Sequence, residues 1–227
     1  MKLLLFDIDG TLLISNGAGR RAMNRGLAPL LGKSSLSTDG VSFGGRTDPQ
    51  IISDILRVNG VSEPEIAAML PDALNAYVTA FTDAFETGFV RALDGAIALV
   101  EKLATVDHVQ LALLTGNVRK TAYLKVSAIG LDRFFPFGAF GSDYADRGKL
   151  PGVAVERALT HNGHEYSGKD IVIIGDTKHD ILCGRALNVY SVAVSTGHYN
   201  AGDLSKYNPD LLLDDLCDTD HFIETVI

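Results

Sequence analysis

The sequence contains few cysteines, only Cys183 and Cys217 among its 227 residues. So small a number excludes a dense disulfide framework, and the separation of the two positions fits no paired metal-ligand spacing. Two reduced thiols are ordinary in a cytosolic protein, because disulfide bonds are rare in that compartment. We therefore expect a cytoplasmic protein in which both cysteines are reduced.

The sequence also lacks any cluster of lysine and arginine, and its formal net charge is -8. Proteins that bind nucleic acids use clustered basic residues to contact the phosphate backbone, so we expect no nucleic-acid partner. Local groups would have to attract an anionic substrate against this overall charge. A bound divalent cation could do so, because such an ion is often the largest local charge in a site.

Long hydrophobic runs are missing as well. The apolar stretch Met1–Phe6 is ended by Asp7 and is too short for a signal sequence or a membrane span. With 46% hydrophobic and 21% charged residues, the composition is typical of a globular protein. We expect a soluble protein without a membrane partner, long enough for one core and a small inserted module.

Several short apolar runs end at small or polar residues. They are Leu3–Phe6, Val109–Leu114, Ile171–Ile174, Val189–Val194 and Leu211–Leu213. The runs do not alternate apolar with polar residues, which favours strands buried on both faces of a parallel sheet. Segments with helical spacing lie between them, at Ala96–Ala104, Arg119–Ala128, Pro151–Thr160 and His179–Leu187. This alternation predicts an α/β fold with a doubly wound parallel sheet, which binds ligands beyond the carboxyl ends of its strands.

Residues 15–88 follow a different pattern, with helical spacing and no convincing buried strand. The helical segments are Arg20–Leu31, Pro49–Val58 and Asp72–Phe85, and the breakers between them are Gly44-Gly45, Asn59-Gly60 and Pro71. We interpret this region as a small α-helical cap domain. It would be inserted into an α/β catalytic core formed by residues 1–14 and 89–227.

The strongest chemical signal is Asp7-Ile8-Asp9-Gly10-Thr11, which follows the first apolar run. If the strand continued, the carboxylates of Asp7 and Asp9 would point the same way. Two like charges so close are costly unless a hard cation offsets them or their protonation states differ. Alternatively, this stretch is only an Asp-Gly turn at the end of a strand, with solvated carboxylates.

Three other strand ends and helix starts carry polar residues. Thr115 could hold an anion through its hydroxyl, or it could simply cap a helix. Lys149 precedes a helix that Pro151 opens, and it could supply a positive charge or be a solvated surface residue. Asp176 and Asp180 follow another buried run, so they bring two more carboxylates toward the same sheet edge, although Asp180 could be only a capping residue.

Taken together, these motifs resemble the haloacid dehalogenase superfamily of phosphatases, whose core is Rossmann-like. The matching residues are Asp7-Ile8-Asp9-Gly10-Thr11, Thr115-Gly116-Asn117, Lys149 with Pro151, and Gly175-Asp176 through Asp180. The resemblance covers nearly the whole chain, with the motifs in the expected order. It departs from the family at Leu150, because the family often has Lys-Pro there. Arg147 could fill the cationic role instead, but we favour Lys149 because its distance to the end of the following helix suits the family pattern.

The resemblance implies both a mechanism and a set of site residues. Asp7 would form an aspartyl-phosphate, and Asp9 would serve as general acid and then general base. The implied Mg²⁺ ligands are Asp7, the backbone carbonyl of Asp9, and Asp176. Phosphate binding would involve Thr115, Gly116 and Asn117, while Lys149 would neutralise charge and Asp180 would orient the network.

The acid at Asp9 suits phosphate esters, because members that cleave carbon–halogen bonds lack it. The helical insertion resembles the cap of phosphoglycolate phosphatases and β-phosphoglucomutases, so the implied substrate is a small phosphorylated metabolite. In the cap, Arg46 could bind a substrate anion or be solvated, whereas we expect Arg20 and His179 to be solvent-exposed. A phosphosugar mutase and a non-catalytic phosphate-binding protein remain alternatives. The assembly state is also open, with a homodimer as one option.

Overall fold

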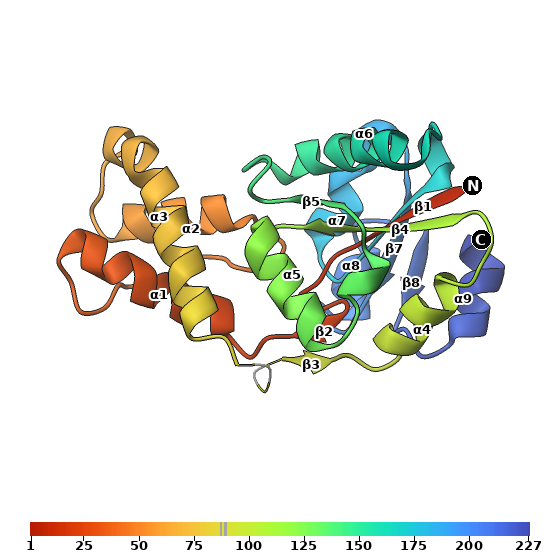
Figure 1. Ribbon diagram of the computed structural model, residues 1–227, viewed down its shortest axis with the longest axis horizontal. Coiled ribbons are helices and arrows are strands. Elements are labelled where there is room, and N and C mark those ends of the chain that lie inside the picture. Colours follow the sequence, from red (N-terminus) through yellow and green to blue (C-terminus); the bar gives the residue numbers. More distant parts are fainter. Residues whose placement is uncertain (87, 89) are drawn as a thin grey trace.

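A six-stranded parallel sheet forms the centre of the computed structural model, which describes residues 1–86, 88 and 90–227. In spatial order the strands are β5 (Gly138–Phe140), β4 (Val109–Thr115), β1 (Lys2–Phe6), β6 (Ile171–Gly175), β7 (Tyr190–Val194) and β8 (Leu211–Leu213) (Figure 1). Every neighbouring pair in this sheet is parallel. This arrangement confirms the predicted doubly wound sheet.

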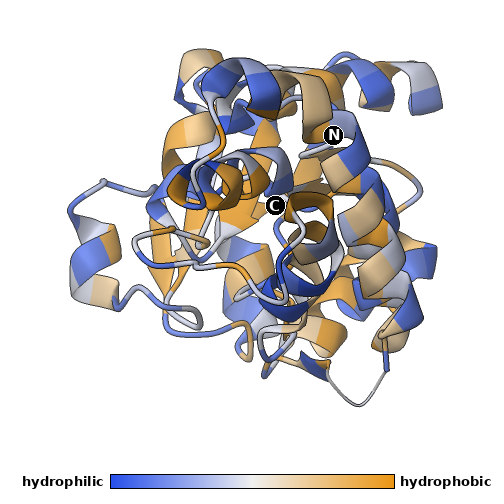
Figure 2. Ribbon diagram, turned by 90° about the vertical axis from the view of Figure 1, so that its left-hand side faces the viewer, coloured by the Kyte–Doolittle hydropathy of each residue, from blue (hydrophilic) through white to orange (hydrophobic). Residues whose placement is uncertain are grey.

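Helices cover both faces of the sheet. They are α4 (Ala96–Leu103), α5 (Arg119–Ala128), α6 (Leu150–Asn162), α7 (Lys178–Cys183), α8 (Ala201–Ser205) and α9 (Thr219–Val226). Leu4 and Phe6 of β1 pack in the same cluster as α4, α5 and α9, whereas Leu3 and Leu5 pack with α6. Both faces of β1 are therefore buried, which explains its unbroken apolar sequence and the hydrophobic colour of the strands in Figure 2.

Three helices form a separate packed unit at one end of the molecule (Figure 1). They are α1 (Ala18–Leu27), which the 3₁₀ turn η1 (Ala28–Leu31) continues, α2 (Asp48–Val58) and α3 (Glu63–Asp83). Their buried side chains, among them Leu27, Ile52 and Tyr77, form a hydrophobic cluster that also includes Val118 at the start of α5. This unit occupies the region in which we predicted a cap, and we refer to these three helices and the loops between them as the cap unit.

A two-stranded ribbon lies where the helical unit joins the core. In it, β2 (Leu13–Ile14) pairs antiparallel with β3 (Arg91–Ala92). The predicted domain boundary after residue 14 coincides with the end of β2. The second boundary, between residues 88 and 89, falls beside residues 87 and 89, which lie outside the described residues.

Several elements differ from the sequence-based expectation, and α8, α9 and the ribbon of β2 and β3 were not predicted. Pro71 was predicted to break a helix, yet α3 runs through it without interruption. A capping box of Ser62 and Glu65 fixes the start of α3, and apolar residues such as Ile66 and Tyr77 are buried on both sides of the proline. The short strand β5 was not predicted, because its sequence, Gly-Ala-Phe, lacks the run of large apolar residues that marked β8. Among the described residues, no helix combines the length and apolar character needed to cross a membrane.

Candidate active site

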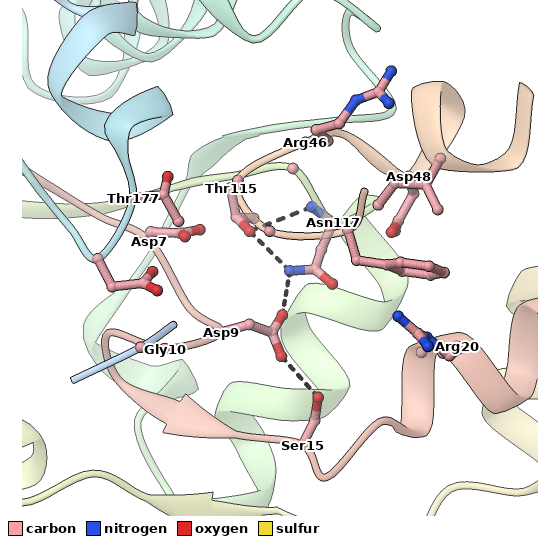
Figure 3. A pocket seen from close by; sticks show the side chains of 18 of the residues that line it. Asp7, Asp9, Gly10, Ser15, Arg20, Arg46, Asp48, Thr115, Asn117 and Thr177 are labelled. Atoms are coloured by element: carbon pink, nitrogen blue, oxygen red, sulfur yellow. Dashed lines mark hydrogen bonds between the residues drawn. The ribbon is translucent and has the colours of Figure 1, made fainter. Parts of the chain in front are cut away.

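A cavity of about 650 Å³ lies between the carboxyl edge of the sheet and the helical cap unit. Its lining includes Asp7, Asp9, Thr115, Asn117, Lys125, Arg147 and Asp176 from the core, and Arg20, Arg46, Asp48 and Tyr77 from the cap unit (Figure 3). Asp7 follows the end of β1, Thr115 is the last residue of β4, and Asp176 follows β6. The register of these neighbouring parallel strands thus brings three sequence-predicted residues into one site.

The floor of the cavity holds a buried acidic cluster. Oxygen atoms of Asp7, Asp176 and Asp180 all lie within 4.8 Å of one another. Burial raises the pKa of Asp7, and the repulsion from Asp180 adds to this effect, although Arg147 opposes it. The pKa of Asp176 is raised well above its ordinary value by burial and by the charges of Asp180 and Asp7. If all of these carboxylates were ionised, they would place more negative charge in the site than the adjacent arginine offsets.

The backbone closes tightly around Asp176. Gly10 has a positive φ of 88°, which glycine adopts readily, and a Cβ atom there would overlap the carboxylate of Asp176. A Cβ atom at Gly197 would overlap the same carboxylate. The hydroxyl of Thr196 donates a hydrogen bond to the carbonyl of Gly10 at 2.6 Å and so ties the two loops together. Asp176 is consequently held in a cradle that only glycines leave open.

The cation beside the nucleophile candidate is Arg147, which corrects our preference for Lys149. Arg147 is buried, forms an ion pair with Asp180 and lies 3.4 Å from Asp7 Oδ1. Lys149 is exposed, and its ammonium lies 5.2 Å from the centre of the Tyr144 ring. Both residues belong to one 3₁₀ turn, η4 (Arg147–Lys149), and side chains two positions apart in such a turn point in different directions. The next residue, Leu150, is buried in the core.

Asp9 is oriented away from the acidic cluster. Its Oδ2 atom accepts a hydrogen bond from Lys125 at 2.6 Å. Oδ2 also accepts one from the Asn117 side-chain amide at 2.8 Å, and Oδ1 accepts one from Ser15 at 2.8 Å (Figure 3). Burial raises the pKa of Asp9, but the charge and hydrogen bond of Lys125 outweigh it, and the pKa is lowered overall. The Asp9 carboxylate is thus absent from the carboxylate cluster around Asp7.

Sequence reasoning missed Lys125. It lies on α5 with 3% of its surface exposed, among the buried residues Ala122 and Val126. A lysine on the buried face of a helix is unusual, because an unpaired buried charge is costly. A lysine among the apolar positions of this helix was therefore the signal by which the sequence could have indicated Lys125 as a functional residue. Its partner could not be read from the sequence, since Asp9 lies 116 positions earlier in the chain.

The second motif, Thr115–Asn117, lines the same cavity as Asp7. Thr115 is fully buried, and its Oγ1 accepts hydrogen bonds from the backbone amide of Asn117 at 3.3 Å and from its side-chain amide at 2.8 Å. A Cβ atom at Gly116 would overlap the carbonyl oxygen of Arg46. The glycine therefore lets the cap loop approach the core closely.

The cap loop contacts the core through backbone and buried polar groups. The amide of Asp48 donates to the carbonyl of Gly116 at 2.8 Å, and its carboxylate accepts from the amide of Val118 at 2.8 Å. The hydroxyl of Thr47 donates to the carbonyl of Ala145 at 2.7 Å, and Arg147 donates to the carbonyl of Gly45 at 3.1 Å. Residues 45–48 therefore join the cap to the loops that carry Thr115 and Arg147.

Arg20 and Arg46 of the cap unit both contribute to the cavity lining. Arg46 contributes to the cavity lining, but its guanidinium points away from Asp7 and Asp9 and pairs with Asp54 (Figure 3). Arg20 is solvent-exposed, as expected, and it also lines the cavity, with its guanidinium 4.2 Å from the centre of the Phe43 ring. His179 is half-buried, and burial together with Arg147 lowers its pKa.

Comparison with known proteins gives a family match over most of the chain. The family model described as haloacid dehalogenase-like hydrolase matches residues 4–194. A phosphoglycolate phosphatase of Colwellia psychrerythraea is 26% identical over 215 residues, covering 94% of this chain and 92% of the relative. A pyrophosphatase PpaX of Listeria monocytogenes is 23% identical, covering 95% of this chain and 93% of the relative.

Solved structures share the fold over nearly the full length. A predicted phosphatase from Clostridium acetobutylicum superposes with a TM-score of 0.75 at 17% identity, covering 98% of both chains. A β-phosphoglucomutase from Clostridium difficile gives a TM-score of 0.72 at 19% identity, covering 100% of this chain and 97% of that one. At these identities, the likeness establishes the fold alone.

Proposed function

This chain belongs to the haloacid dehalogenase-like hydrolase family, and on that premise we propose that it is a Mg²⁺-dependent phosphatase with Asp7 as its covalent nucleophile. The observation that carries the proposal is the position of Asp7. This buried carboxylate lies at the floor of the cavity, beside Arg147 and within 4.8 Å of other carboxylate oxygens. A carboxylate that attacks phosphorus needs such a charged, water-poor site, because positive charge must offset its repulsion from the phosphate.

The donors around Asp7 fit a magnesium ion. Mg²⁺ prefers hard oxygen ligands and usually binds through one or two carboxylates plus water and substrate oxygens. Asp7 and Asp176 would hold it, because both oxygens of Asp180 already accept hydrogen bonds, from Arg147 and from Thr177. The buried excess of negative charge is the condition that a divalent cation would relieve. When bound, the ion would screen the repulsion between the nucleophile and the phosphate.

The protein residues then divide the reaction between them. An Asp7 oxygen attacks phosphorus while the bond to the leaving oxygen breaks, and Asp9 supplies the proton that this oxygen needs. In the second half, water attacks the aspartyl-phosphate, Asp9 takes a proton from that water, and phosphate leaves Asp7. The lowered pKa of Asp9 favours the ionised form, which is the form that accepts a proton in this second step. The first step uses the protonated form of Asp9, against which Lys125 acts.

Phosphate binding is assigned to the second motif and to Arg147. Thr115, Gly116 and Asn117 line the cavity together with Asp7, so their hydroxyl and amide groups can hold phosphoryl oxygens. Arg147 offsets the charge of both Asp7 and the phosphate. A cavity of about 650 Å³ suits a small ligand, since such sites usually measure roughly 300–1,000 Å³.

The proposed substrate is a small phosphorylated metabolite of the phosphoglycolate or sugar-phosphate type. Its support is the name of the phosphoglycolate phosphatase relatives together with the size of the cavity. Arg20 lies at the cap side of this cavity and is the group that would meet a second anionic centre of the substrate.

Phosphate release from a panel of phosphorylated metabolites tests the proposal. The panel should contain phosphoglycolate, several sugar phosphates and pyrophosphate, each measured with Mg²⁺ and with a chelator. We expect Mg²⁺-dependent release that Asp7→Asn abolishes, while Asp72→Asn, a change of the same kind at an exposed site, leaves it intact. Near-wild-type release by Asp7→Asn would remove Asp7 as the nucleophile. Absence of release with every compound would contradict a phosphatase and favour the mutase, for which sugar-phosphate interconversion is the assay.

A further inference from the structure

Lys125 is a buried cation that the reaction scheme above does not use. Among the described residues, only Lys125 and Arg147 are buried side chains with a permanent positive charge. Arg147 faces Asp7 and Asp180, whereas Lys125 lies on the other side of the cavity and faces Asp9. A buried lysine is tolerated only when its charge and hydrogen bonds are satisfied, so its partners indicate its purpose.

The ammonium of Lys125 connects two residues of the site. It donates to Asp9 Oδ2 at 2.6 Å and to Asn117 Oδ1 at 2.6 Å. The bond to Asn117 matters for orientation, because an amide oxygen and an amide nitrogen have the same shape and differ only in whether they accept or donate. With its oxygen held by Lys125, the Asn117 side chain must direct its nitrogen toward Asp9 Oδ2 and Thr115 Oγ1, both at 2.8 Å.

The cap unit encloses Lys125 from the other side. Its ammonium lies 5.7 Å from the centre of the Phe81 ring on α3, and Asp48 on α2 is a second carboxylate whose charged form it favours. Phe81 is 2% exposed, so water has little access to the lysine from this direction. The lysine is therefore held between the core helix α5 and the cap.

From these contacts we propose that Lys125 is a positioning residue that fixes the Asp9 carboxyl group and the Asn117 amide for the leaving-group step. The inference rests on the proposed function, since it assigns to Lys125 the orientation of the general acid. Lys125 acts through Asp9 and Asn117, which line the same cavity as Asp7. Its removal should therefore harm the reaction only as far as the reaction depends on a well-placed proton donor.

Leaving groups of different acidity separate this role from a purely structural one. An alkyl phosphate releases an alkoxide that needs a proton, whereas p-nitrophenyl phosphate releases a stable phenolate that needs little assistance. The quantity to compare is kcat/KM, because it reports the steps up to departure of the leaving group and is independent of later hydrolysis of the aspartyl-phosphate. Asp9→Asn provides the reference pattern for loss of the acid.

The experiment uses Lys125→Met, Lys125→Gln and Lys125→Arg with both esters, and Lys120→Met as the matched control on the exposed face of the same helix. We expect Lys125→Met to lower kcat/KM for the alkyl ester about 10- to 100-fold, part of the roughly 10²–10⁴ that general acid–base catalysis supplies. For p-nitrophenyl phosphate we expect a loss of less than about 3-fold, since that leaving group needs little proton transfer. Lys125→Arg should recover part of the alkyl-ester activity, and Lys120→Met should change neither substrate.

Equal losses for both esters would overturn the inference, because a damaged fold affects every substrate alike. Unchanged activity of Lys125→Met would overturn it as well. Thermal unfolding of each variant identifies one that does not fold, in which case Lys125→Gln, which keeps hydrogen-bonding groups without the charge, provides the same comparison. If the wild-type protein releases phosphate from neither ester, the proposed function fails, and that result is distinct from the substrate-independent loss that refutes the role of Lys125 alone.

Discussion

At the scale of single residues, the site separates two carboxylates that are only two positions apart. Asp7 faces Arg147, while Asp9 faces Lys125 and Asn117. The pKa values of the two groups shift in opposite directions. Burial raises the pKa of Asp7 and the charge of Asp180 adds to it, whereas at Asp9 the charge and hydrogen bond of Lys125 outweigh burial. Two carboxyl groups in different environments can take the roles of nucleophile and acid–base group.

The assignment of the cationic role to Arg147, and not to Lys149, gives a direct prediction at this scale. Arg147→Met should lower kcat/KM at least about 100-fold, the size of effect seen when one group that stabilises transition-state charge is removed. Lys149→Met should change it by less than about 2-fold, because the exposed Lys149 side chain lies against the Tyr144 ring and not in the cavity lining. Steady-state kinetics of both variants provides the comparison.

The prediction has its own internal control. Arg147 also pairs with the buried Asp180, so its loss leaves a buried carboxylate without its cation and should reduce stability. Arg147→Lys keeps the charge and separates the two effects, because it should retain more stability than Arg147→Met. A Lys149 variant as impaired as the Arg147 variants would restore the assignment made from the sequence.

At the scale of elements, the first turn of α2 contacts the start of α5. The Asp48 carboxylate accepts the amide hydrogen of Val118, the residue that precedes α5, and Asp48 lies in the first turn of α2 itself. A helix start favours a negative charge, and Lys125 favours it too. Burial nevertheless outweighs these contributions and raises the pKa of Asp48 to about 6. The joint between cap and core therefore contains a carboxyl group that folding makes harder to ionise.

This raised pKa predicts how stability depends on pH. The folded protein holds the Asp48 proton up to about pH 6, whereas the unfolded chain releases it near the ordinary pKa of 3.8. Between these values the folded state binds more protons, so the free energy of unfolding falls as pH rises, by roughly 3 kcal/mol at most, and then levels off. The variant Asp48→Asn has no ionisable group at this position, so its free energy of unfolding does not fall for this reason. Its stability relative to wild type should therefore increase from about pH 4 to pH 6 and stay constant above.

Urea unfolding of wild type and Asp48→Asn across this pH range is the measurement. Other buried carboxylates titrate in both proteins, so the difference between the two isolates Asp48. Asp72→Asn, at an exposed position, should parallel wild type at every pH. A relative stability of Asp48→Asn that is flat or falls between pH 4 and 6 would contradict the burial of an ionisable carboxyl group at this joint.

At the scale of the whole molecule, the sheet and the strand-end residues could be predicted from the sequence. The unbroken apolar run Leu3–Phe6 fixes where β1 ends, and the end of a parallel strand is where Asp7 must lie. Thr115 and Asp176 follow by the same reasoning. What remained hidden depends on packing between distant segments, because local patterns do not say which side of η4 faces the cavity or that α5 brings Lys125 to Asp9. The positions of Arg20 and Arg46 likewise depend on how the cap sits over the core.

The account as a whole depends on a covalent intermediate at Asp7, and rapid-quench analysis of Asp9→Asn with p-nitrophenyl phosphate and Mg²⁺ tests this most directly. Without a general base for water, this variant should still transfer phosphate from the activated ester and then stall. We predict a burst of p-nitrophenol equal to the enzyme present, and a phosphoryl group recovered on the peptide that contains Asp7. A linear release without a burst, or a phosphoryl group on another residue, would contradict Asp7 as the nucleophile.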